Sequence, residues 1–356
     1  MNSLPVGKLP NEMLRGFLEK LDIRDEAVVL GPQVGEDAAV LRPGRGLLVA
    51  NTDPITFASD LVGWYAVHIN ANDVATMGAV PRWFLASALL PEGSAPAQAE
   101  AVFDQLVSAC ASLDITLVGG HTEIARGFQH PVVVGFMLGE VAESALITSS
   151  GARPGDEIVL TKAIAIEGTA LLAREAELAL VALGLGPDFI QGAKDCLFSP
   201  GISVVRDALT ACSRADVNCM HDPTEGGLST ALWEIAEAAG VGILVEEEMV
   251  PVLPQCRDIC RGLGLDPWGL VSSGSLVITL PPSQVSGLVG ALAEAGIEAR
   301  GIGRVVERER GLKVSTGGRT RELPRFQRDE LARFLESVPK PPGPSRSPGL
   351  KKNKGG

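Results

Sequence analysis

The sequence lacks several features that would each indicate a particular class of protein. Basic residues are outnumbered and the formal net charge is −12, which argues against nonspecific binding to nucleic acid, because a polyanion would be repelled. No run approaches the ~18 to 20 apolar residues that a membrane-spanning helix needs. Residues 1–10 have neither the basic start nor the apolar stretch of a signal peptide. We therefore expect a cytoplasmic protein without a nucleic-acid or membrane partner.

Cysteine is present, but in no pattern that binds metal. Only Cys256 and Cys260 are close in sequence, and no C-x-x-C pair has the second half that a zinc site requires. We expect buried, reduced thiols, as in cytoplasmic proteins. The six positions are Cys110, Cys196, Cys212, Cys219, Cys256 and Cys260.

Aromatic residues are sparse at 4%, whereas glycine is abundant, with 41 residues. This combination is compatible with close packing of small side chains and with glycine-rich phosphate loops. Apolar residues make up 46% of the chain, which is normal for a globular protein with a substantial core. The acidic charge does not exclude ATP, because magnesium and local loops hold a nucleotide. A chain of 356 residues predicts about two domains.

Strand-like and helix-like segments alternate in an irregular order, which indicates an α+β fold rather than a simple doubly wound sheet. Small, turn-forming residues at 148–156 mark the best domain boundary. We predict an N-terminal domain over 1–150, a C-terminal domain over 151–337 and a disordered tail with solvated basic side chains over 338–356. Predicted strands cover 46–51, 82–90, 115–118, 131–141, 157–161, 216–220, 241–245, 275–280 and 299–305. Predicted helices cover 63–77, 96–113, a segment from about 168, 204–213, 228–239 and 283–295.

Three predicted strands, 46–51, 82–90 and 131–141, are nearly continuous apolar runs. Strands that are apolar on both faces need cover on both faces, and one domain of roughly 150 residues has too few helices to supply it. We therefore predict a homodimer that pairs two such sheets and hides the second face.

The segment His221–Gly227 says most about function. It places a short acidic loop between a predicted strand and the predicted helix 228–239. A helix start carries unpaired N–H groups and a partial positive charge, which favour an anion such as phosphate. Two glycines let the backbone approach a ligand, and a neighbouring carboxylate can hold a metal against that phosphate; the alternative is a plain capped turn. The candidate residues are Asp222, Thr224, Glu225, Gly226 and Gly227.

Two further acidic segments and a polar helix face lie upstream. The turn Gly35–Val40 contains Asp37, and Asp53 follows a predicted strand. On the next predicted helix, Asn70 and Asp73 are three residues apart and share one face. An exposed polar stripe is the simpler interpretation, but the low helix propensity of the stretch favours function.

A fourth segment, Gly119–Glu123, follows the predicted strand 115–118. Glycines at a strand end expose amides, and the side chains after them offer oxygens to a cation. Magnesium takes oxygen ligands and bridges to phosphates, so we predict magnesium ligands at Asp37, Asp53, Asp73 and Glu123. Further nucleotide contacts are predicted at Asn70, Gly119, Gly120 and Thr122. His121 and Asp222 are the catalytic candidates, and His121 is either a general base or only a hydrogen-bond donor of the loop.

Taken in order, these motifs resemble those of the aminoimidazole ribonucleotide (AIR) synthetase superfamily. The first half matches through Gly35–Val40, Thr52–Asp53, Asn70–Pro81 and Gly119–Glu123. The second half resembles the HypE branch of that superfamily through Asp222–Leu228, Glu234–Ala236, Gly242–Ile243, Val250–Val252, Cys260–Pro267 and Gly274–Leu276. The resemblance covers roughly residues 10 to 310.

The resemblance implies two domains, a dimer formed through the N-terminal sheet, and ATP with magnesium in the cleft between the domains. It also implies transfer of the γ-phosphate to a substrate oxygen. In the HypE branch that oxygen belongs to a carbamoyl group on a terminal cysteine, whose dehydration serves hydrogenase maturation. A hydrogenase-maturation partner is therefore expected.

Two departures from the HypE pattern bear on the reaction. HypE proteins generally have Asp where this chain has His121, and this sequence has no cysteine after Cys260. We therefore expect a substrate that is free or carried by a partner, rather than self-modification. The alternatives are a non-catalytic nucleotide-binding maturation protein and a thiamine-monophosphate kinase.

Overall fold

The computed structural model describes residues 7–8, 11–30, 40–44 and 46–337. The predictions for Asp37 and for a tail over 338–356 therefore lie outside the described residues. Near the N-terminus the described elements are α1 (Asn11–Leu18) and a two-stranded pair of β2 (Val28–Leu30) and β3 (Val40–Leu41).

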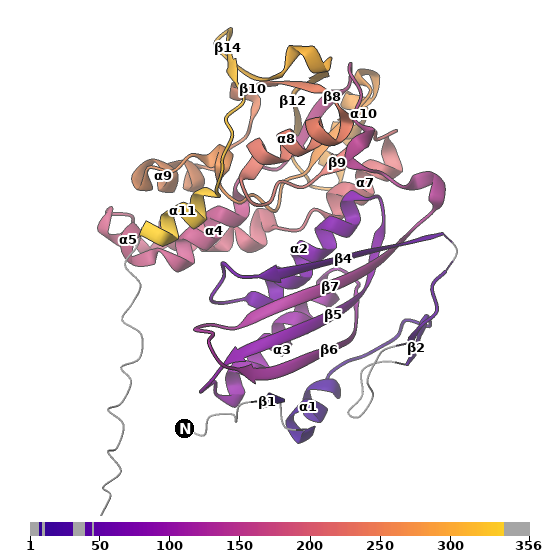
Figure 1. Cartoon of the computed structure of the whole chain (residues 1–356), viewed down its shortest axis with the longest axis vertical. Coiled ribbons are helices and arrows are strands. Elements are labelled where there is room, and N and C mark those ends of the chain that lie inside the picture. The colour runs from indigo at the N-terminus through magenta and orange to yellow at the C-terminus, as the bar shows by residue number, and fades with distance from the viewer. Residues whose placement is uncertain (1–6, 9–10, 31–39, 45, 338–356) are drawn as a thin grey trace, which may run out of the picture.

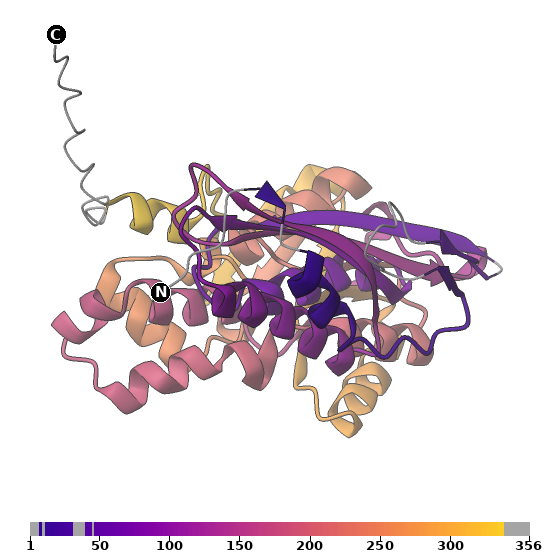
Figure 2. The same ribbon diagram turned by 90° about the horizontal axis from the view of Figure 1, so that it is seen from below.

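The first half of the chain forms a five-stranded sheet in the order β1-β6-β5-β7-β4. Strands β5 and β6 are parallel, and the other neighbours are antiparallel. Helices α2 (Val62–Thr76) and α3 (Pro96–Ser112) lie together against one face (Figures 1 and 2). The strands are β1 (Gly7–Lys8), β4 (Leu47–Ile55), β5 (Val80–Pro91), β6 (Thr116–Ala125) and β7 (Val132–Val141).

The other face of this sheet has no described helix over it, and Figure 2 shows the helices of this half on one side only. Register places Leu48, Glu140 and Val80 in one row across β4, β7 and β5. Leu48, Val80 and Phe136 are exposed by 49%, 48% and 39%. Apolar patches of this kind are unusual on the surface of a monomeric protein.

The second half forms a seven-stranded sheet in the order β14-β13-β10-β12-β8-β11-β9. Alternate residues of its strands enter two cores: Ile158 and Leu160 pack with α8 (Gly227–Ala239), whereas Val159 packs on the side of α7 (Val205–Arg214) and α10 (Val285–Glu294). This sheet is therefore covered on both faces. Its strands are β8 (Glu157–Thr161), β9 (Cys219–His221), β10 (Gly242–Glu246), β11 (Val277–Leu280), β12 (Ala299–Val306), β13 (Leu312–Thr316) and β14 (Arg319–Glu322).

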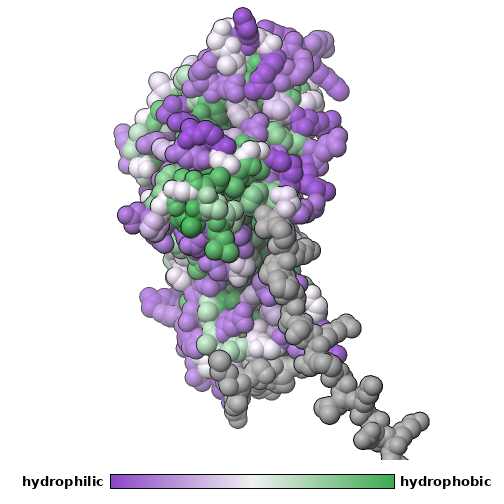
Figure 3. All heavy atoms as spheres, turned by 90° about the vertical axis from the view of Figure 1, so that its left-hand side faces the viewer, coloured by the Kyte–Doolittle hydropathy of each residue, from purple (hydrophilic) through white to green (hydrophobic). Residues whose placement is uncertain are grey.

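Five more helices of the second half pack near one another, with Leu171, Ile190 and Ile259 among their buried residues. The short helix α5 exposes Leu178 by 87% and Val181 by 55%, and an apolar area is visible on that side of the molecule in Figure 3. None of the described helices is long and apolar enough to cross a membrane. The five helices are α4 (Ile166–Glu175), α5 (Glu177–Ala182), α6 (Pro187–Asp195), α9 (Pro254–Leu263) and α11 (Glu330–Ser337).

The predicted α+β fold is confirmed, and most predicted elements are present with shifted ends. One prediction was wrong: Gly119–Glu123 is not a loop, because β6 continues through it to Ala125. Strand β5 pairs along the whole segment and β1 pairs with Glu123 and Ile124, so hydrogen bonds on both sides keep the backbone extended. A Cβ at Gly120 would lie 2.1 Å from the carbonyl oxygen of Ala86, so close approach of β5 explains this glycine.

Candidate functional site: an acidic cluster between the two halves

Helix α2 is the element that joins the two halves. It is buried almost all round, because the first sheet covers one side and the second half covers the other. The Asn72 side chain donates to the carbonyl of Ile202 at 2.9 Å and accepts from the amide of Val204 at 2.8 Å. Sequence reasoning did not select Asn72, which fixes the helix against the second half.

Polar side chains from β4 and α2 form a network on another side of the helix. Asn51 Nδ2 donates to the Asp73 carboxylate and, at 3.3 Å, to Asn70 Oδ1. Asn70 Nδ2 in turn donates to the carbonyls of Ala66 at 2.8 Å and Asp53 at 3.3 Å. The structure therefore brings Asp53, Asn70 and Asp73 together as the sequence predicted, and adds Asn51, which the sequence analysis did not select.

The loop after β9 brings a third carboxylate to this network. Asp222 is 3% exposed, and its Oδ2 has no hydrogen-bond partner among the described residues. Burial raises the pKa values of Asp73 and Asp222, and the facing carboxylates raise them further: Asp222 and Asp53 act on Asp73, and Asp53 acts on Asp222. Burial and Glu225 raise the pKa of Asp53. We call Asp53, Asp73 and Asp222 the acidic cluster.

The helix start after this loop differs from the phosphate site that the sequence suggested. The amide of Gly226 donates to Asp329 Oδ2 at 2.7 Å, and the amide of Gly227 donates to the carbonyl of Thr224 at 3.0 Å. A Cβ at Gly227 would lie 2.5 Å from the carbonyl oxygen of Trp268. Both amides are thus engaged within the chain, and packing against the segment around Trp268 explains the second glycine.

His121 and Glu123 lie away from the acidic cluster within this chain. Their side chains contact each other at 3.2 Å and are both exposed. Register places them beside Ser87 and Leu89 of β5, and β5 and β7 separate β6 from β4. Gly119, Gly120 and Thr122 belong to the same strand.

The chemistry of the acidic cluster suits a divalent cation. Like charges at close range disfavour ionisation, and a cation would relieve both that repulsion and the unpartnered Asp222 oxygen. Carboxylate oxygens are also the ligands that magnesium prefers. Within the described residues, no three His, Cys, Asp or Glu side chains stand close enough to hold a metal by themselves, so a cation here would need further oxygens from phosphate or water.

A small cavity adjoins the acidic cluster and contains residues from both halves. It measures about 60 Å³ and is lined by Asp53, Tyr65, Glu167, Thr224 and Ser273, among others. Burial raises the pKa of Glu167 to about 7, and hydrogen bonding from Ser273 opposes that shift. Sequence reasoning missed Glu167, although a single acidic residue inside the apolar stretch 163–172 was a usable signal.

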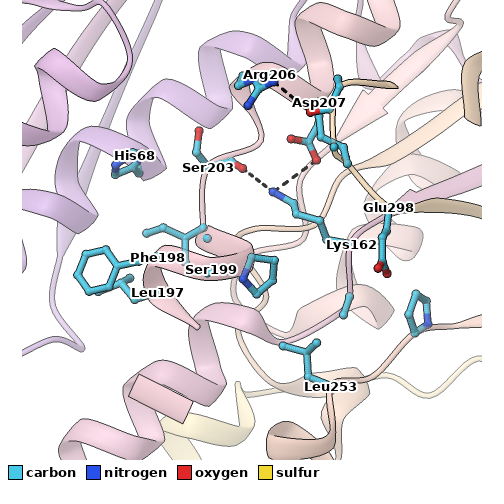
Figure 4. A pocket seen from close by; sticks show the side chains of 18 of the residues that line it. His68, Lys162, Leu197, Phe198, Ser199, Ser203, Arg206, Asp207, Leu253 and Glu298 are labelled. Carbon is cyan, nitrogen blue, oxygen red and sulfur yellow. Dashed lines mark hydrogen bonds and ion pairs between the residues drawn. The ribbon is translucent and has the colours of Figure 1, made fainter. Parts of the chain in front are cut away.

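A second, larger cavity of about 690 Å³ lies on the Trp64 and His68 side of α2. Figure 4 shows the Lys162 ammonium between the Ser203 carbonyl and the Asp207 carboxylate. These contacts measure 2.6 and 3.4 Å, and Asp207 also accepts from Thr161 at 2.6 Å. Burial lowers the pKa of Lys162, and Asp207 opposes that shift. The buried charges of this cavity are therefore paired.

Comparison with known proteins agrees with this organisation. The model for the N-terminal domain of AIR synthase related proteins matches residues 35–141, and the model for the C-terminal domain matches residues 153–314. The two domains in this order, with an acidic cluster where they meet, define the class. The chain belongs to the AIR synthase related protein family.

Its relatives include the HypE proteins. The carbamoyl dehydratase HypE of Cupriavidus necator is 32% identical over 286 residues, which span 77% of this chain and 78% of that protein. A crystal structure of the hydrogenase maturation protein HypE is 26% identical, with a TM-score of 0.74 over 89% of this chain and 98% of that one. A structure of HypE in complex with ATP is 25% identical, with a TM-score of 0.69 over 90% and 93% of the two chains.

Proposed function

We propose that this protein is an ATP- and magnesium-dependent enzyme that phosphorylates the oxygen of a carbamoyl or similar carboxamide group and thereby dehydrates it. The observation that carries the proposal is the acidic cluster, in which the buried Asp222 and the partly buried Asp53 and Asp73 face one another and need a cation. Relatives named carbamoyl dehydratase and a HypE structure in complex with ATP support the choice of reaction and nucleotide.

The chemistry balances with ATP as the only co-substrate. The carboxamide oxygen attacks the γ-phosphorus and ADP leaves. The nitrogen then loses its two protons, and the C–O bond breaks as phosphate departs, leaving a nitrile or thiocyanate. Transition-state charge in phosphoryl transfer accumulates on phosphate oxygens, so electrostatic neutralisation is the main catalytic requirement.

Within this proposal, Asp53, Asp73 and Asp222 hold the cation. Asn51 orients the Asp73 carboxylate by its hydrogen bond. Magnesium, when bound, neutralises the triphosphate and the facing carboxylates. Asp37 keeps its predicted role as a further ligand. His121 and Glu123 do not join the cluster within one chain and are not needed for this assignment.

We also infer a homodimer and a partner in hydrogenase maturation. The uncovered face of the first sheet, with Leu48 and Phe136, supports the dimer because a second copy would bury it. Relatives named for hydrogenase expression and maturation support the partner. The six free thiols fit the reducing cytoplasm that the sequence predicted.

The test is ADP release with an S-carbamoylated cysteine peptide, with thiocyanate as the second readout. We expect wild-type protein to release ADP and thiocyanate in equal amounts, only with magnesium. Asp222→Asn should lower the rate by at least about a hundredfold, because a preorganised charge at the phosphate is removed. ADP release without thiocyanate, or with thiamine monophosphate instead, would refute the dehydration and identify a kinase.

A further inference from the structure

The loop Asp222–Gly226 carries one of the three carboxylates of the acidic cluster and leads into α8. It ends at Gly226, whose φ of 77° lies in the left-handed region and which has no side chain to cap the helix. The Gly226 amide donates instead to Asp329 Oδ2 at 2.7 Å. Among the described residues, this is the only hydrogen bond between the loop backbone and a side chain from outside the loop. Asp329 therefore holds the end of the loop.

Asp329 is itself fixed from two directions. It lies directly before α11, is 5% exposed, and its Oδ1 accepts from the amide of Leu331 at 2.7 Å in the first turn of that helix. Burial raises the pKa of Asp329 to about 6, and its hydrogen bonds from the amides of Gly226 and Leu331 oppose that shift. Hydrogen bonds to an ionised acceptor are stronger than those between neutral groups. At pH 8 one carboxylate anion therefore joins the starts of α8 and α11.

The segment before Asp329 lies along α8, which brings the carboxylate to the start of that helix. The carbonyl of Pro324 accepts from Ser229 Oγ and, at 3.3 Å, from Trp233 Nε1. The Arg325 guanidinium lies 5.0 Å from the centre of the Trp233 ring. Pro324, Arg325 and Asp329 all lie beyond residue 314, where the match to the C-terminal domain model ends. The loop of the acidic cluster is therefore held by a part of this chain that the family match does not cover.

We propose that Asp329 is a positioning residue for the proposed reaction, because its bond to Gly226 holds the loop so that Asp222 faces Asp53 and Asp73. The proposal rests on the proposed function and adds a residue that acts through Asp222 rather than on the substrate or the cation. Only three residues separate Asp222 from Gly226, so release of the loop end also frees the carboxylate. A loop that is not held must be ordered when the cation binds, and this ordering lowers affinity.

The neighbouring residue Glu330 supplies a matched control. It is 7% exposed, its Oε2 accepts from the amide of Asp266 at 3.1 Å, and it pairs with Arg333. Asp329 and Glu330 are thus both buried carboxylates that hold a backbone amide, but Asp266 lies outside the loop of the acidic cluster. If Asp329 served only the stability of the fold, Asp329→Ala and Glu330→Ala would affect the same measurements.

Isothermal titration of magnesium–ATP at pH 8 tests the assignment, at a temperature at which circular dichroism shows each protein to be folded. We expect the Kd to rise at least about tenfold in Asp329→Ala and to stay within about twofold of wild type in Glu330→Ala. Asp329→Asn keeps the size of the side chain but only one acceptor oxygen, and should weaken binding at least about threefold. If the alanine variant does not fold, Asp329→Asn replaces it.

A kinetic measurement separates positioning from a general loss of activity. In Asp329→Ala the magnesium concentration that gives half the maximal rate of ADP release should rise at least about tenfold. The rate at saturating magnesium should stay within about threefold of wild type, because excess cation draws the Asp222 carboxylate back into place. In Glu330→Ala both quantities should match wild type.

The two measurements also separate this inference from the proposed function. If wild-type protein releases no ADP, the proposed reaction fails, and the titration of magnesium–ATP still decides the role of Asp329. Weaker binding in the Asp329 variants alone supports positioning. Equal affinity in wild type and the Asp329 variants, an equal loss in Glu330→Ala, or no binding by wild type overturns it.

Discussion

Two sides of helix α2 contact the second half of the chain, and they differ in their carboxylates. On one side a carboxylate is paired with a cationic side chain, and on the other side carboxylates face one another. On the side of the large cavity, Asp207 faces the Lys162 ammonium and accepts a hydrogen bond from Thr161. On the side of the acidic cluster, Asp73 faces Asp53 and Asp222. A cationic side chain beside a buried carboxylate neutralises its charge, so no ligand is required. Carboxylates that face one another repel, and a bound cation would remove that repulsion.

Burial alone does not distinguish the two sides. Asp207, on α7, and Asp222, directly after β9, are 2% and 3% exposed. The difference lies in the neighbouring charges: the Lys162 ammonium pairs with Asp207, whereas Asp53 and Glu234 raise the pKa of Asp222 further and His221 opposes them. This is why a large cavity lined by paired charges is a weaker indication of the reaction site than a small one lined by unpaired carboxylates.

The largest expected change in stability follows from removing one partner of the Lys162–Asp207 ion pair. Asp207→Ala leaves the Lys162 ammonium buried without its counter-charge, and should lower the free energy of unfolding by about 3 to 5 kcal/mol. The double variant Lys162→Met/Asp207→Leu should be much closer to wild type, because no isolated charge remains. Urea unfolding measures both. A loss of less than about 1 kcal/mol for Asp207→Ala would show that the pair is not a structural element.

In the acidic cluster, removal of a carboxylate should increase the free energy of unfolding rather than lower it. Burial and the facing carboxylates raise the pKa of Asp73 to about 9, so ionisation weakens the folded state as pH rises from about 4 towards 9. Asp73→Asn removes this penalty and should stabilise the metal-free protein at pH 8 by at least about 1 kcal/mol. At pH 4 the variant and wild type should unfold at the same urea concentration. A variant that is less stable than wild type at pH 8 would contradict the repulsion.

Magnesium should raise the thermal stability of the wild-type protein through the acidic cluster, in a way that depends on pH. At pH 8, about one unit below the raised pKa of Asp73, the cation displaces the remaining proton from the cluster, and the melting temperature should rise by about 2 to 4 °C. At pH 5 the raised pKa values of Asp73 and Asp222 keep these groups protonated, and the rise should disappear. Asp73→Asn should show no rise at either pH, and differential scanning calorimetry measures each case. An equal rise in all of them would place the cation elsewhere.

Sequence reasoning identified the acidic cluster because spacing and loop chemistry are local. The i, i+3 relation of Asn70 and Asp73 on one helix, and the turn residues around Asp222, can be interpreted without a tertiary structure. Glu167 was missed because the side chains that line the cavity with it, such as Tyr65 and Ser273, come from distant segments, and its place in an apolar stretch is only a weak local signal beside the ordinary preference for an acidic residue in the first turn of a helix.

The error at Gly119–Glu123 has a similar origin. Adjacent glycines ordinarily indicate a turn, but here tertiary pairing with β1 and β5 overrides that preference. The amides of Gly226 and Gly227 are likewise engaged by Asp329 and by the loop itself. In both places the adjacent glycines are an unusual local pattern. Their cause is contact with segments that are distant in the sequence, rather than a phosphate-binding loop.

The smallest expected effect on stability concerns the uncovered face of the first sheet. Phe136→Ser should change the free energy of unfolding of the monomer by less than about 1 kcal/mol, because the side chain is 39% exposed. The same change should shift the mass in light scattering from twice the 37.2 kDa chain mass to a single chain. Phe128→Ser, exposed by 38% and outside the described strands, is the control and should leave the dimer intact. A wild-type protein that is monomeric at micromolar concentration would refute the dimer.

The most direct test of the acidic cluster as a nucleotide site is isothermal titration of ATP with magnesium. Three proteins are compared at pH 8: wild type, Asp73→Asn in the acidic cluster, and Arg206→Ala in the large cavity on the other side of α2. We expect Asp73→Asn to weaken binding at least about tenfold and Arg206→Ala to leave it within about twofold of wild type. Equal affinity in wild type and Asp73→Asn, or no binding by wild type, would contradict the assignment.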